Sequence, residues 1–117
     1  MTAEWDRFWS ENWPRTRARF AAWWRHEGLI VHITAPADEP RAVSAPPVPE
    51  PATIEKAWLD PAWRVWRAEQ EMARTYFGGD AFPYFDTQIG PGSLGIFLGA
   101  TPHFAPDTVW YEPFITD

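Results

Sequence analysis

The carboxylate of Asp86 is the side chain of this sequence that is best placed to do chemistry. It ends a short aromatic run that predicts a strand over 82–86, and a glycine-rich turn follows it. Active sites of α/β folds gather at the carboxyl ends of strands. We therefore take Asp86 as the candidate catalytic residue, with an Asx turn or a helix N-cap as its alternative role. Tyr84, which would share its face of the strand, and Gln88, just beyond it, are candidate substrate-binding residues.

The other polar groups offer weaker candidates. His26, His32 and His103 lack the spacing of metal ligands, and the chain contains no cysteine. We therefore expect this chain to hold no metal or other cofactor. His32 lies in a predicted strand and is a third candidate for substrate binding, with a packed core histidine as the alternative. The Gly-Pro-Gly at 90–92 lacks the spacing of a phosphate loop, so we interpret it as a turn.

The first half of the chain predicts helices followed by one strand and a long loop. Apolar residues at helical spacing predict helices over 3–12 and 14–27, the second closed by Gly28. A β-branched run predicts a buried strand over 29–34. Residues 35–53 contain six prolines and predict an extended loop. The chain has nine tryptophans, several at helical spacing, which favours packing over the stacking of a ligand.

The second half predicts helices alternating with strands. We expect a short helical turn from Ile54, a helix from Asp60-Pro61 to Gly78-Gly79, the strand at 82–86, a helix over 93–99 and a strand over 108–112. Strands separated by helices are typical of a parallel sheet with crossover connections, so the fold class predicted is α/β. Because three strands cannot cover the edges of such a sheet, we expect the chain to be the beginning of a longer domain.

Size and charge narrow the classes of partner. The 117 residues correspond to a single domain at most. The net charge of -6 makes nucleic acid and anionic membranes unfavourable partners, and no apolar run is long enough to span a bilayer. The acidic, amphipathic start lacks the basic and apolar regions of a signal peptide. We therefore expect a cytoplasmic protein.

The segment 81–113, AFPYFDTQIGPGSLGIFLGATPHFAPDTVWYEP, resembles the divergent, decarboxylase-like branch of the uroporphyrinogen decarboxylase superfamily. In that family a strand ends in an aspartate, followed by four residues, a proline, two more residues and Leu-Gly. Asp86, Pro91, Leu94 and Gly95 match this spacing. The element order of the whole chain is similar as well, which implies that residues 1–117 form the N-terminal portion of one (β/α)8 barrel of the TIM type. The resemblance further implies that Asp86 lies at the barrel mouth, accepts pyrrole N–H groups and stabilises the positive charge that develops during decarboxylation.

The resemblance also implies a class of parent enzyme, either a cofactor-independent decarboxylase (a lyase) or a corrinoid-linked methyltransferase. The family's arginine-rich segment after the first strand is replaced by HITAP at 32–36, so we expect a small or tetrapyrrole-type substrate other than uroporphyrinogen itself. Zinc or a corrinoid would belong to the full-length parent, with the zinc ligands beyond Asp117. The chain alone would be an inert fragment, whose partners are the rest of the barrel or a second copy. The alternative function is a non-enzymatic, Trp- and Pro-rich protein-interaction module.

Overall fold

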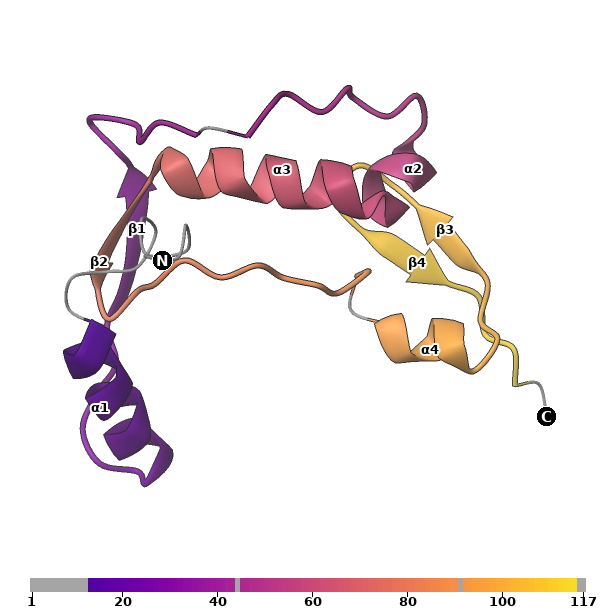
Figure 1. Ribbon diagram of the computed structural model, residues 1–117. Coiled ribbons are helices and arrows are strands. Elements are labelled where there is room, and N and C mark those ends of the chain that lie inside the picture. The colour runs from indigo at the N-terminus through magenta and orange to yellow at the C-terminus, as the bar shows by residue number, and fades with distance from the viewer. Residues whose placement is uncertain (1–12, 44, 91, 116–117) are drawn as a thin grey trace, which may run out of the picture. The chain divides into compact units, whose positions relative to one another are not determined.

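The computed structural model describes residues 13–43, 45–90 and 92–115. In chain order the elements are α1 (Trp13–Trp24), β1 (His32–Pro36), α2 (Ile54–Leu59), α3 (Pro61–Ala73), β2 (Thr75–Gly79), α4 (Ser93–Phe97), β3 (Pro102–Phe104) and β4 (Val109–Tyr111) (Figure 1). They group into two compact units. The first unit contains residues 1–44 and 68–84, and the second contains 45–67 and 85–117.

Helix α1 corresponds to the helix predicted over 14–27 but ends earlier, at Trp24. The His26 N–H donates to the Trp23 carbonyl at 2.8 Å, and the Glu27 N–H donates to the Ala22 carbonyl at 3.0 Å. These two bonds form a Schellman motif, in which the residue just past the helix adopts a left-handed conformation. That residue is His26, with a φ of 64°, so Gly28 does not close the helix as predicted. The helix predicted over 3–12 lies outside the described residues.

This helix end gives a prediction about stability. His26→Gly should raise the free energy of unfolding by about 1 kcal/mol, because a Cβ in the left-handed region is strained and glycine has none. Urea unfolding followed by circular dichroism measures the change. His26→Ala is the matched control, since alanine removes the imidazole and keeps the strain. A gain in both variants, or in neither, would contradict this account of the helix end.

Strands β1 and β2 pair antiparallel, with His32 opposite Gly79 and Pro36 opposite Thr75. The strand predicted over 29–34 is therefore shifted to 32–36. The helix predicted to reach Gly78-Gly79 ends at Ala73, and residues 75–79 form β2 instead. Thr-Tyr-Phe is a run of strong strand formers, and backbone hydrogen bonds to β1 satisfy it better than a continued helix would. Pro36 can end β1 because this strand lies at a sheet edge.

Most elements predicted for the second half of the chain are confirmed, among them the short helix from Ile54 (α2) and the helix from Ser93 (α4), which ends at Phe97, and one is wrong. Helix α3 begins at Pro61, and the Asp60 carboxylate accepts the Trp63 N–H at 3.1 Å, as expected of an N-cap followed by proline. The strand predicted over 108–112 is present as β4. The strand predicted over 82–86 is wrong, since residues 81–88 form neither helix nor strand.

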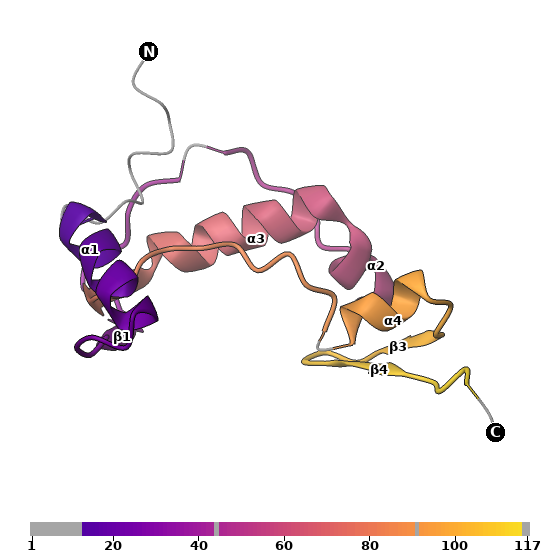
Figure 2. The ribbon, with the colours of Figure 1, turned by 90° about the horizontal axis from the view of Figure 1, so that it is seen from below.

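Strand β4 pairs antiparallel with β3, which the sequence did not predict, and α4 lies next to this pair (Figures 1 and 2). Only residues 105–108 separate the two strands, which is too short for a crossover, so they must run antiparallel. The mixture of helix and strand agrees with the α/β class at its coarsest level. The predicted parallel sheet is wrong for the described residues, whose two sheets each contain one antiparallel pair.

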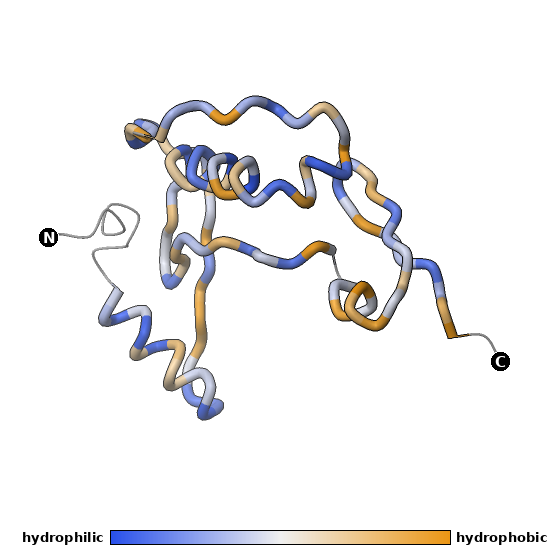
Figure 3. Tube along the Cα trace, turned by 45° about the vertical axis from the view of Figure 1, so that its right-hand side comes forward, coloured by the Kyte–Doolittle hydropathy of each residue, from blue (hydrophilic) through white to orange (hydrophobic). Residues whose placement is uncertain are grey.

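The buried apolar residues of the described parts are few and small: Ala73, Ala81, Ala100 and Val109. Large apolar side chains remain exposed, among them Trp24 at 79% and Phe97 at 85%. The turns of α4 are coloured largely as hydrophobic in Figure 3, and two of the helix's apolar side chains, Leu94 at 71% and Phe97, are exposed. Among the described residues, no helix is both long and apolar enough to cross a membrane.

Candidate functional site

Asp86 lies in the irregular segment after β2, with its side chain exposed to solvent. Its Oδ1 accepts the backbone N–H of Gln88 at 2.8 Å. This bond forms an Asx turn, the alternative role that the sequence left open. Within the described part of the chain, the second carboxylate oxygen has no hydrogen-bond partner. Asp86 therefore offers one oxygen that is held by its own backbone and one that is open to a ligand.

Arg64 of α3 ties the backbone of this turn to the helix. Its Nη2 donates to the carbonyl oxygens of Asp86 and Gln88, each at 2.9 Å. Its guanidinium carbon also lies 5.5 Å from the centre of the Phe85 ring, within the range of a cation–π contact. No role for Arg64 was predicted from the sequence. Nothing in the local spacing links it to residues more than 20 positions away.

The far end of the same loop is tied to α4 and β4. The Ser93 hydroxyl accepts the Ile89 N–H at 2.9 Å and donates to the Gly90 carbonyl at 2.7 Å. The Tyr111 hydroxyl of β4 donates to the Ile89 carbonyl. Gly90 has a φ of 73°, as expected where a turn begins. The loop that carries Asp86 is thus anchored on both sides.

Two of the other predicted site residues, Tyr84 and His32, lie in the chain's other unit and not in that of Asp86. Tyr84 is 64% exposed and belongs to the first unit, where its ring lies 6.3 Å from that of Phe82. His32 is the first residue of β1, also in the first unit, and is exposed. Gln88 contributes its backbone amide to the Asx turn. Of the four predicted site residues, the structure brings Asp86 and Gln88 into contact and assigns Tyr84 and His32 to the other unit.

A second aspartate, Asp80, forms a buried charged centre that the sequence did not indicate. It is 2% exposed and follows directly on β2. Its Oδ2 accepts the Val31 N–H at 2.9 Å, and its own N–H donates to the Val31 carbonyl at 2.6 Å. The Arg19 Nε atom lies 2.6 Å from Oδ1, and the two groups form an ion pair. The Nε–H bond is not aligned with Oδ1, so the pair is not a hydrogen bond. The Arg19 Nη2 donates to the Leu29 carbonyl at 2.6 Å.

These contacts perturb the titration of Asp80. The hydrogen bond from Val31 lowers the pKa of the Asp80 carboxyl below its ordinary value of 3.8; burial opposes this effect, and Arg19 and Arg15 add to the lowering. Both carboxylate oxygens are already engaged and water is excluded. Asp80 is therefore a structural carboxylate that joins α1, β1 and β2, and Asp86 is the one open to a ligand.

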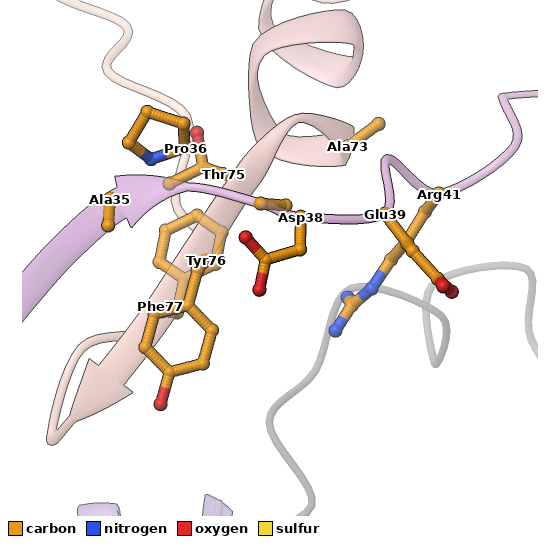
Figure 4. Close-up of a pocket in the computed structure, with 10 residues that line it drawn as sticks. Ala35, Pro36, Asp38, Glu39, Arg41, Ala73, Thr75, Tyr76 and Phe77 are labelled. Carbon is orange, nitrogen blue, oxygen red and sulfur yellow. The ribbon is translucent and has the colours of Figure 1, made fainter.

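A cleft of about 510 Å³ in the first unit lies at the end of the β1–β2 pair (Figure 4). It is lined by β1, β2 and the segment after β1, which contributes Asp38, Glu39 and Arg41. Asp38 and Glu39 are exposed, so water screens their attraction for a cation. None of the predicted site residues lines this cleft.

Comparison with known proteins identifies no relative. No family model, curated protein or solved structure matches this chain. The described residues contain no group of three or more His, Cys, Asp or Glu side chains that could hold a metal ion.

Proposed function

We propose that this chain is the N-terminal part of a barrel enzyme similar to the uroporphyrinogen decarboxylases, with Asp86 as its charged acceptor group. One observation carries the proposal. The Asp86 carboxylate is exposed, has one oxygen held in an Asx turn and one free of protein partners within the described residues, and stands in an anchored loop. The spacing from Asp86 to Gly95, which resembles that family, supports the same assignment.

The chemistry expected of Asp86 is electrostatic. An ionised carboxylate only accepts hydrogen bonds, so it favours N–H donors and positive charge on a bound ring. If polypeptide closing over the loop excluded water, this attraction would strengthen as the ring gains positive charge on the way to decarboxylation. The substrate class proposed is a small or tetrapyrrole-type molecule with ring N–H groups. A methyltransferase parent, with zinc or a corrinoid held by other residues, is the related alternative.

The exposed apolar side chains of the described residues support the proposal that further polypeptide packs against this chain. Side chains such as Trp24 and Phe97 stay largely in water, which is unfavourable by roughly 25 cal/mol for each Å² of apolar surface. We propose that the rest of the barrel covers this surface, with a second copy of the chain as the other source. The parallel barrel strands would then come from outside the two antiparallel pairs described above. On this proposal the chain alone is inert.

The test is Asp86→Asn in the complete enzyme, in which this chain is joined to the polypeptide that supplies the remaining strands. Turnover, measured as release of carbon dioxide, should fall by about 100-fold or more, because the stabilising charge is lost. The fold should be retained, since the asparagine side-chain oxygen can still accept the Gln88 N–H. Asp107→Asn, at an exposed aspartate between β3 and β4, is the control. Unchanged turnover in Asp86→Asn would rule out the proposed role.

The second candidate function is a non-enzymatic interaction module, favoured by the exposure of Trp24 and Phe97. The same variant separates the two. A module that binds a protein through its apolar side chains should keep its affinity for that partner in Asp86→Asn and lose affinity when Phe97 is replaced by serine. If the chain is part of a decarboxylase, Asp86→Asn should instead lower the turnover of the complete enzyme.

A further inference from the structure

We propose that Arg64 is a positioning residue, which orients the Asp86 carboxylate so that one oxygen stays available to a ligand. This inference rests on the proposed function of Asp86. The inference extends that proposal by naming the residue that fixes the geometry of the Asp86 carboxylate.

The contacts of Arg64 surround the turn of Asp86. The guanidinium donates to the carbonyl of Asp86 and to that of Gln88, and it covers the ring of Phe85, so that one side chain holds three positions of the loop. The Asx turn bridges the same two residues, from the Asp86 side chain to the Gln88 amide. Because Arg64 holds the carbonyls of Asp86 and Gln88, it fixes the distance between the Asp86 side chain and the Gln88 amide that the Asx-turn hydrogen bond must span. Arg64 therefore favours the side-chain orientation in which Oδ1 is occupied and Oδ2 is open.

The charge of Arg64 is directed at the backbone. Within the described part of the chain, no ion pair joins Arg64 to the Asp86 carboxylate. An arginine paired directly with that carboxylate would occupy its acceptor sites and neutralise its charge. By donating to the carbonyl oxygens instead, Arg64 orients the acceptor and leaves its negative charge for the ligand. Orientation of this kind matters because small displacements of a reacting group cost large factors in rate.

Arginine is required by this arrangement. Its planar guanidinium carries several N–H donors in fixed directions and stacks on an aromatic ring, while lysine has a single ammonium on a flexible stem. Arg64→Lys therefore keeps the charge on α3 and loses the geometry.

The test follows the Gln88 amide by NMR in the 117-residue chain as the pH is lowered through the titration of Asp86. An amide proton bonded to a carboxylate shifts as that carboxylate is protonated, so the size of the shift reports how much of the Asx turn is formed. In Arg64→Lys the amplitude should fall to about half or less, because two hydrogen bonds and the ring contact are lost. Asp86→Asn should abolish the titration, which assigns it to Asp86. Arg17→Lys, at an exposed arginine of α1, is the matched control and should change nothing.

The outcomes separate the two proposals. An unchanged amplitude in Arg64→Lys overturns the positioning role, whatever Asp86 does in catalysis. A reduced amplitude together with unchanged turnover of Asp86→Asn in the complete enzyme supports positioning and rejects the proposed function. If both hold, Arg64→Lys should lower turnover in the complete enzyme and add little further loss to Asp86→Asn.

A second variant covers the case in which Arg64→Lys does not fold. Phe85→Leu removes only the ring beneath the guanidinium, and Phe85 is 38% exposed, so the fold should tolerate the change. A partial fall in the amplitude of the Gln88 titration supports the role of Arg64, and an unchanged amplitude counts against it.

Discussion

Gly79→Ala should lower the free energy of unfolding by about 2 to 5 kcal/mol, the sum of a left-handed backbone strain and an overpacked contact. Gly79 has a φ of 66°, and a Cβ built on it would lie 2.4 Å from the carbonyl oxygen of Val31. That oxygen belongs to the backbone and cannot rotate away as a side chain would. It also accepts the Asp80 N–H, so moving it would disturb the buried centre around Asp80.

Urea unfolding of the 117-residue chain, followed by tryptophan fluorescence, measures this loss. Gly28→Ala is the matched control, because Gly28 has a φ of 77° and nothing lies within 4 Å of a Cβ built there. Its cost should be the backbone strain alone, about 1 to 2 kcal/mol. If Gly79→Ala costs no more than Gly28→Ala, the close approach of Val31 has no effect on stability and the prediction fails.

The stability of the chain should also fall in acid, because of Asp80. Its pKa is lowered in the folded state, first by the Val31 hydrogen bond, so the unfolded chain binds a proton more readily. The stabilisation is therefore fully present above the ordinary pKa of 3.8 and is lost as the pH falls below that value toward the lowered pKa of the folded state. Protonation would also end the ion pair with Arg19, whose side chain is 37% exposed and stays solvated, so that its loss adds little.

The measurement is the urea midpoint as a function of pH, from neutral pH to below 3.8. Asp80→Asn should be less stable than the wild type at neutral pH, and the difference should shrink as the pH falls. Asp38→Asn, at an exposed aspartate of the segment after β1, should run parallel to the wild type throughout. A constant difference between Asp80→Asn and the wild type at every pH would show that the charge of Asp80 does not stabilise the fold.

Some features of this structure could be predicted from the sequence, and others could not. The start of α3 was predictable because Asp60, Pro61 and the Trp63 amide are neighbours, and a capping bond needs no other part of the chain. The end of α3 was not. Residues 75–79 continue a helical pattern in sequence, and their strand conformation depends on β1, which lies some 40 positions earlier. The helical spacing of the apolar residues was outweighed by the strand propensity of Thr75, Tyr76 and Phe77 together with their pairing to β1.

The same distinction applies to the two aspartates. The sequence by itself indicated that Asp86 precedes a turn and can bond its own backbone, because the Asp86 and Gln88 groups are two residues apart. Only the tertiary structure placed Arg64 on that loop and surrounded Asp80 with Arg19 and Val31. Turns and caps are bonds between near neighbours, so residue types reveal them. The contacts of Arg64 with the loop and of Asp80 with Arg19 and Val31 join groups that are far apart in the sequence, and they arise only when the chain brings those groups together.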